Sequence, residues 1–76
     1  MDEEILLVIA EALDFEREEV YPEASLKNDL IIDSLDYIVI IMALEDAFGI
    51  ELLYKDILAE FKTVRDIIEY IKKEKA

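Results

Sequence analysis

Ser34 lies between two aspartates at the start of the most hydrophobic segment of the chain, in the order Asp33-Ser34-Leu35-Asp36. Its hydroxyl has no evident catalytic partner, because the 76 residues include neither histidine nor cysteine. The chain therefore lacks the most common general base and any thiol nucleophile. Hydrolysis at this serine would need an unusual base, such as a desolvated lysine. We expect no catalytic residue, no metal site and no free-standing enzyme.

The same residues suit the plain start of a helix, because Asp and Ser are ordinary capping residues. A helix N-terminus also stabilises an added phosphate or phosphodiester through its backbone N–H groups and its dipole. The flanking carboxylates would oppose that charge by themselves, but they would suit a Mg²⁺ ion brought by a modifying enzyme. From these residues alone, Ser34 is either a helix cap or a hydroxyl that another enzyme modifies.

Hydrophobic periodicity predicts that helices position this serine. A first helix follows the i, i+3, i+4, i+7 spacing, and a long connection after it contains the only proline and several turn formers. We predict a single domain, 1–76, with an all-α fold: a small four-helix bundle of three principal helices and one short helix, with a long ordered loop between the first two. The helices are expected at residues 2–15, 34–48, 53–61 and from 64, with the loop at 16–33.

The second helix carries two apolar stripes and ends before Gly49, the residue expected after a helix C-terminus. A domain of this size can hardly surround a helix, so one stripe should remain exposed as a partner surface. One stripe consists of Tyr37, Ile40, Ile41, Leu44 and Phe48. The other consists of Leu35, Ile38, Val39 and Met42 and continues into Glu45 and Asp46. Four apolar side chains of the loop should dock on the helices and hold the loop in place: Val20, Tyr21, Leu26 and Leu30. The predicted core is Ile5, Val8, Ile9, Leu13, Leu26, Leu30, Ile40, Leu44, Phe48, Ile57, Phe61, Val64, Ile67, Ile68 and Ile71.

Twenty acidic residues against eight basic ones give a net charge of −12. Such a field repels phosphate backbones and anionic lipid, so neither nucleic acid nor stable membrane insertion is expected. It favours proteins that present Lys and Arg patches. Acidic residues 2–4 stand where a signal peptide would have basic residues, and the apolar runs are too short to span a bilayer. We expect a monomer in the cytoplasm.

The motif and its surroundings resemble an acyl carrier protein over nearly the whole chain. The tripeptide Asp-Ser-Leu alone would be a weak signal, but its register within four expected helices and the charge of −12 make the match specific. The segments that carry it are Asn28-Asp29-Leu30, Asp33-Ser34-Leu35-Asp36, Met42-Ala43-Leu44-Glu45-Asp46-Ala47-Phe48-Gly49-Ile50-Glu51, Thr63-Val64, Asp66 and Ile68-Glu69-Tyr70-Ile71.

The resemblance implies that Ser34 receives 4′-phosphopantetheine from coenzyme A through a Mg²⁺-dependent phosphopantetheinyl transferase. The thiol of this arm would carry acyl groups as thioesters for fatty-acid, related lipid or secondary-metabolite biosynthesis. Partners would be that transferase and acyl-transfer and synthase enzymes with basic patches. By position, Asp33, Leu35 and Asp36 belong to the attachment motif, and Ile38, Val39, Met42, Glu45 and Asp46 to the partner surface. The acyl-cavity lining would be Ile40, Ile41, Leu44, Ile57, Leu58 and Phe61.

Three departures from the family pattern stand out. Ile31 occupies a position that is often glycine, and because β-branched residues avoid positive φ, the turn before the motif is expected to take another shape. Val39 replaces a usual glutamate, and residues 53–56 differ and add one residue. These changes favour a specialised carrier. An aminoacyl carrier of the D-alanyl type, or a small helical interaction module without a prosthetic group, are the alternatives.

Overall fold

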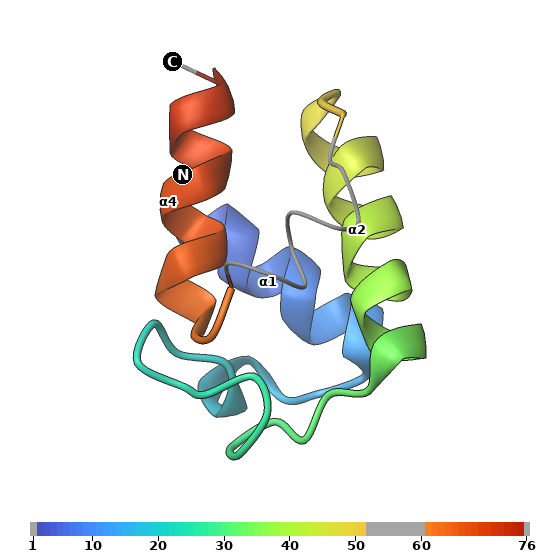
Figure 1. Cartoon of the computed structure of the whole chain (residues 1–76). Helices are drawn as coiled ribbons and strands as arrows, with labels where there is room; N and C mark the ends of the chain where they lie inside the picture. Colours follow the sequence, from blue (N-terminus) through green and yellow to red (C-terminus); the bar gives the residue numbers. More distant parts are fainter. Residues whose placement is uncertain (1, 52–60, 76) are drawn as a thin grey trace.

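Three α-helices and one 3₁₀-helix form the computed structural model, which describes residues 2–51 and 61–75 (Figure 1). They are α1 (Asp2–Leu13), η1 (Arg17–Glu19), α2 (Ser34–Phe48) and α4 (Val64–Lys75). Within these ranges the only β pairing is an isolated bridge between Ser25 and Thr63. The predicted all-α fold is confirmed, and the predicted helix at 53–61 lies outside the described residues except for Phe61. None of the helices in the described ranges has the length and apolar character needed to cross a membrane.

Helix α1 is the element that both other α-helices contact (Figure 1). Three acidic residues occupy its first turn, where the positive end of the helix dipole favours carboxylates. It ends two residues earlier than predicted, because Asp14 adopts a left-handed conformation with φ 59°. The Phe15 N–H then donates to the Ala10 carbonyl at 2.8 Å, which satisfies a carbonyl that the helix end would leave open.

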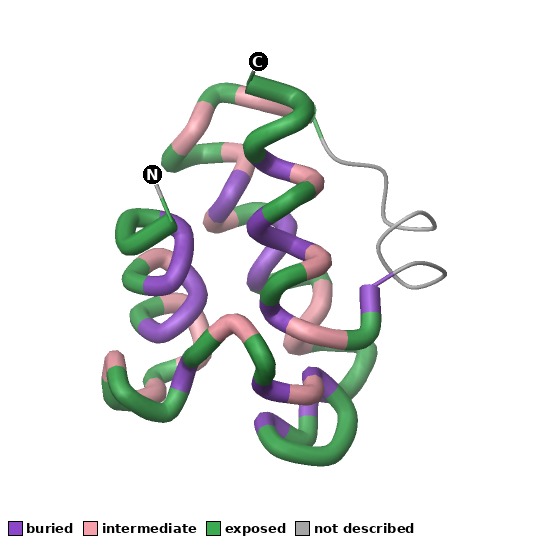
Figure 2. The backbone as a smooth tube through the Cα atoms, turned by 90° about the vertical axis from the view of Figure 1, so that its left-hand side faces the viewer, coloured by how far each residue is buried: buried purple, intermediate pink, exposed green. Residues whose placement is uncertain are grey.

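The core lies where the inner faces of the helices and the loop meet (Figure 2). Most predicted core residues are buried, whereas Val8, Leu13 and Phe48 are only partly buried and Ile57 lies outside the described residues. Six buried residues lie outside the predicted core list: Leu6, Ala10, Ala24, Ile32, Ile41 of the predicted inner stripe of α2, and Val20, which the sequence predicts as an anchor of the loop.

The connection from α1 to α2 is ordered and packed, as predicted. Val20, Leu26 and Leu30 are buried, and backbone hydrogen bonds tie the loop to the start of α4, including Val64 N–H to the Ala24 carbonyl at 3.1 Å. The prediction for Tyr21 is wrong, because its side chain is exposed. Val20 has extended backbone angles, and neighbouring residues of extended backbone point to opposite sides. Burial of Val20 therefore turns Tyr21 outward.

The turn before the serine motif is the second wrong prediction, since Ile31 does adopt a positive φ of 53°. Both of its neighbours are buried, and the Ile32 N–H donates to the Leu26 carbonyl at 2.9 Å. The chain must reverse direction between these two buried residues, and the positive φ of Ile31 produces the reversal. Its own side chain is 77% exposed, so it contributes nothing to the core.

We expect Ile31→Gly to stabilise the protein by about 1 kcal/mol. A left-handed non-glycine residue costs on the order of 1–3 kcal/mol, whereas the extra flexibility of an unfolded glycine offsets roughly 0.5–1 kcal/mol of the gain. Urea unfolding would measure the change. Asp14→Gly is the matched control, because Asp14 is the other non-glycine residue with a positive φ in the described ranges, and it should gain less because aspartate tolerates this conformation better. An unchanged or lower urea midpoint for Ile31→Gly would contradict the argument.

Helix α4 begins with the capping box that the sequence Thr63-Val64-Arg65-Asp66 predicts. The Asp66 N–H donates to Thr63 Oγ1 at 3.4 Å, and Asp66 Oδ2 accepts the N–H groups of Thr63 and Lys62 at 3.0 and 2.9 Å. These hydrogen bonds, the one from the Lys62 backbone first, hold the pKa of the Asp66 carboxyl below its usual value. The ionised carboxylate therefore stabilises the folded chain at pH values above the ordinary pKa of an aspartate.

Asp66→Asn should lower the free energy of unfolding at pH 7 by about 1 kcal/mol, the size of a capping interaction at a partly exposed site. Because the pKa is lower in the folded state than in the unfolded one, this contribution is complete above about pH 5 and is lost as pH falls below about 4. Urea unfolding of both proteins at pH 7 and pH 3 should show the gap closing at low pH. A gap that does not depend on pH would mean that the charge has no part in the cap.

Candidate functional site

The motif around Ser34 forms the start of α2, and two aspartates hold it in place. Asp33 is the N-cap, and its Oδ1 accepts the Asp36 N–H at 3.0 Å. In return, Asp36 Oδ2 accepts the Asp33 N–H at 3.2 Å, which completes a capping box. Both carboxylates thus satisfy backbone donors that a helix N-terminus leaves open. The structure decides between the two predicted caps in favour of Asp33.

Ser34 is the first residue of α2 and is exposed to solvent. Its neighbours in sequence, Asp33 and Leu35, are exposed as well, so a large partner can approach the hydroxyl. The backbone that carries it is fixed on one side by the capping box and on the other by buried Ile32. The combination is a reachable hydroxyl on a rigid helix start, next to the positive end of the dipole of a 15-residue helix.

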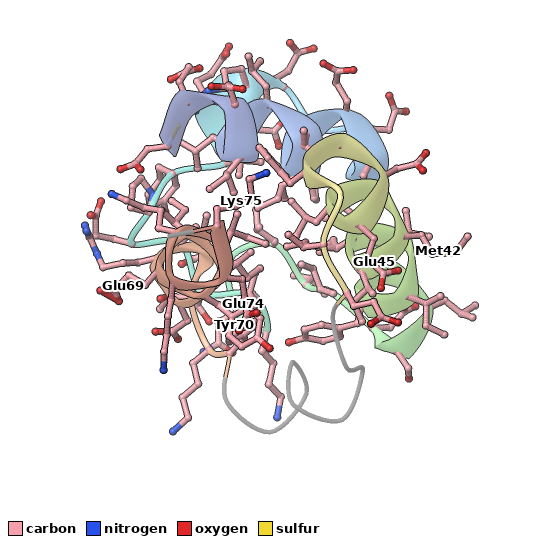
Figure 3. All side chains as sticks on the ribbon, turned by 90° about the horizontal axis from the view of Figure 1, so that it is seen from above. Met42, Glu45, Glu69, Tyr70, Glu74 and Lys75 are labelled. Carbon is pink, nitrogen blue, oxygen red and sulfur yellow. The ribbon has the colours of Figure 1, made fainter. Side chains whose placement is uncertain are left out.

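The two stripes of α2 separate as predicted. Ile40, Ile41 and Leu44 are buried, and Tyr37 and Phe48 pack partly against the core. The second stripe is exposed, and Met42 points away from α4 in the view along the helices (Figure 3). Glu45 is half-buried and Asp46 exposed at its C-terminal end. The exposed members are Leu35, Ile38, Val39 and Met42, which we call the apolar stripe.

Ile31 is a neighbour of the site that the sequence pattern did not assign to it. It is 77% exposed and three residues before Ser34, so it adds apolar surface on the loop side of the serine. The sequence offered no clear signal for this exposure, because Leu30, Ile31 and Ile32 are all apolar and only the structure shows that the first and the last are buried.

The predicted acyl-cavity residues are only partly described. Ile40, Ile41, Leu44 and Phe61 are all buried, whereas Ile57 and Leu58 lie outside the described ranges. Phe61 packs edge-on against Tyr70 of α4, with ring centroids 5.3 Å apart, and it lines a pocket of about 320 Å³ next to Tyr37 of α2. The residues of α2 in the predicted lining belong to the packed core. Their part in holding an acyl chain stays a prediction.

The chain is similar in sequence to known proteins over most of its length. A family model described as a phosphopantetheine attachment site matches residues 3–71. The chain is 41% identical over 76 residues to an acyl carrier protein of Syntrophobacter fumaroxidans, covering all of this chain and 93% of the relative. It is 41% identical over 69 residues to an acyl carrier protein of Thermosynechococcus vestitus, covering 91% of this chain and 84% of that one. An acyl carrier protein of Syntrophus aciditrophicus is 38% identical over 72 residues, with 95% and 89% covered.

Proposed function

Because this chain belongs to the acyl carrier protein family, whose members carry 4′-phosphopantetheine covalently, we propose that Ser34 is its attachment residue. The observation that carries the proposal is the exposed serine at the first position of α2, with its backbone held by the reciprocal Asp33–Asp36 capping box. A modifying enzyme can reach this hydroxyl without unfolding the helix. In this proposal residues 1–76 form one acyl carrier domain.

The residues around Ser34 fit a phosphodiester. The α2 N-terminus offers the positive end of its dipole, which favours a negative charge at this point. Asp33 and Asp36 each accept a backbone N–H, and their remaining lone pairs are available to a Mg²⁺ ion that a transferase brings. When bound, the group supplies a flexible arm whose thiol carries acyl groups as thioesters. With neither histidine nor cysteine, the chain itself has no imidazole or thiol to attack such a cargo.

The partner surface in this proposal is the apolar stripe together with Glu45 and Asp46. Exposed apolar side chains rimmed by carboxylates fit a partner that has an apolar patch among Lys and Arg side chains. A phosphopantetheinyl transferase and acyl-handling enzymes would use the same face, because each must bring its active site to Ser34. The acidic field of the chain would speed their encounter.

The cargo in this proposal is an acyl group of fatty-acid, related lipid or secondary-metabolite biosynthesis in the cytoplasm. The matched relatives are acyl carrier proteins, which favours an acyl over an aminoacyl cargo. Val39 is exposed within the partner surface, at a position where the family usually has a glutamate, and this difference favours a specialised set of partners. The carrier itself performs no catalysis.

Intact mass spectrometry after incubation with coenzyme A, Mg²⁺ and a broad-specificity phosphopantetheinyl transferase tests the proposal. We expect a gain equal to one phosphopantetheine group in the wild-type chain and none in Ser34→Ala. Ser25→Ala, at the partly buried serine of the loop, is the matched control and should gain the same mass as the wild type. No gain with several transferases would favour an interaction module without a prosthetic group. A gain that persists in Ser34→Ala would move the attachment elsewhere.

A further inference from the structure

Ile31 has the most exposed of the large apolar side chains in the described ranges. It is 77% exposed, compared with 71% for Leu35 and 63% for Met42 of the apolar stripe. A single exposed apolar residue is ordinary on a protein surface, but this side chain adds almost no burial to the fold. Its role therefore depends on its backbone conformation and its position.

The backbone of Ile31 is unfavourable for an isoleucine. Its φ of 53° lies in the left-handed region, where the branched Cβ meets steric conflict. The buried neighbours Leu30 and Ile32 fix the place of this turn, and a glycine would form it without that conflict. Folding thus gains nothing from the isoleucine and is opposed by its conformation. Strained residues of this kind cluster at sites where they serve binding or catalysis.

Ile31 lies close to the serine along the chain. It precedes Ser34 by three residues, so their Cα atoms are at most about 11 Å apart even in a fully extended segment. The segment has a fixed course, because the Ile32 N–H donates to the Leu26 carbonyl at 2.9 Å and α2 begins two residues later. The serine is thus flanked in sequence by two strongly exposed aliphatic side chains, Ile31 before it and Leu35 after it.

Among the proposed partners, the phosphopantetheinyl transferase is the one that must cover this place. It has to bring coenzyme A to the Ser34 hydroxyl, whereas enzymes that act on the cargo work at the far end of the arm. A specific interface buries about 800 Å² on each protein, equivalent to a disc with a radius of about 16 Å. A disc of that size around Ser34 includes Ile31.

Two exposed carboxylates indicate what the transferase must present around the isoleucine. Asp29 precedes Ile31 by two residues and Asp33 follows it by two. A pocket that accepts this side chain would be apolar inside, and Lys or Arg side chains at its edge would pair with the carboxylates. The net charge of −12 attracts the same basic edge.

We propose that the Ile31 side chain enters an apolar pocket of the phosphopantetheinyl transferase, edged by Lys or Arg, when that enzyme docks at Ser34. The inference rests on the proposed attachment at Ser34 and adds a residue of the loop to a partner surface that otherwise belongs to α2. Ile31 is a docking residue rather than a catalytic one, because it touches the enzyme and not the reacting atoms.

The test measures kcat and KM of the transferase that modifies the wild-type chain, with Ile31→Gly, Ile31→Ala and Ile31→Leu as carriers. Ile31→Gly and Ile31→Ala should raise KM about five- to thirty-fold and leave kcat within about twofold, because a docking contact is made equally before and during the reaction. Ile31→Leu should keep KM within about threefold, since leucine retains an aliphatic side chain of the same size. Urea unfolding of Ile31→Gly should at the same time show a raised midpoint.

The opposite signs of the two effects separate docking from folding, because a folding defect cannot weaken docking in a chain that has become more stable. Leu7→Ala, at an exposed leucine of α1, is the control and should keep the KM of the wild type.

An unchanged KM in both Ile31→Gly and Ile31→Ala would overturn the inference. So would an effect of Ile31→Gly that Ile31→Ala does not share, since it would come from the flexible backbone of glycine and not from the lost side chain. A loss confined to kcat would assign Ile31 to the positioning of Ser34 and would also overturn the docking role. An absent mass gain in the wild-type chain would overturn the attachment at Ser34 and this inference with it, whereas the other outcomes leave the attachment intact.

Discussion

Leu44→Ala is expected to lower the free energy of unfolding by about 3 kcal/mol. Leu44 is fully buried in the hydrophobic core, and truncation removes its apolar contacts and leaves a cavity. A chain of 76 residues has a total stability of roughly 4–11 kcal/mol, so this one change removes a large share of it. Urea unfolding followed by far-UV circular dichroism would measure the loss.

Leu35→Ala is the matched control, because it makes the same substitution in the same helix at a side chain that is 71% exposed. Its effect on stability should stay within about 0.5 kcal/mol. If both variants lost the same stability, the assignment of the two stripes of α2 to core and surface would be incorrect.

The opposite pattern is expected for function. Leu35→Ala/Met42→Ala should reduce kcat/KM for phosphopantetheinylation of Ser34 by about 30- to 700-fold while leaving the melting temperature unchanged. Both side chains are exposed on the apolar stripe, Met42 by 63%, so they contribute little to folding. Apolar anchors at the centre of an interface each contribute on the order of 1–2 kcal/mol to binding, and 1.4 kcal/mol is a tenfold change.

The measurement is the initial rate of coenzyme A consumption by the transferase at carrier concentrations well below KM. Leu7→Ala provides the control, since Leu7 is an exposed leucine on α1 rather than on the stripe, and its rate should equal that of the wild type. A normal rate for Leu35→Ala/Met42→Ala would place partner recognition on another surface of the molecule. A lowered melting temperature would instead show that the stripe supports the fold.

These two expectations follow from one property of α2. A helix that is apolar nearly all round must divide its surface between the core and a partner, because a chain of this size has too few elements to cover it. Burial of Ile40, Ile41 and Leu44 anchors the helix, and the capping box fixes its start. Ser34 therefore sits on a rigid support, while the apolar stripe next to it remains available to other proteins.

Local sequence determined the elements and the serine site. Several features could be predicted because each depends on side chains within one or two helical turns: a cap of α2 at Asp33 or Ser34, the capping box at Thr63–Asp66, the glycine that ends α2 and the two stripes. The reciprocal bond from Asp36 that completes a box at the start of α2 was not predicted. The exposure of Ser34 also follows locally, since it precedes the buried face. For these features the interactions that decide the outcome are present in the sequence at short range.

Only the tertiary structure decided the conformation of Ile31, the outward side of Tyr21 and the attachment of the loop to the segment before α4. Intrinsic preference argued against a positive φ for isoleucine, but burial of Leu30 and Ile32 on both sides outweighed it. The loop reaches the segment before α4 through backbone hydrogen bonds such as that from the Leu26 N–H to the Lys62 carbonyl, although the two segments are far apart in the sequence. Such outcomes depend on how distant segments share one core, and no local pattern carries that information.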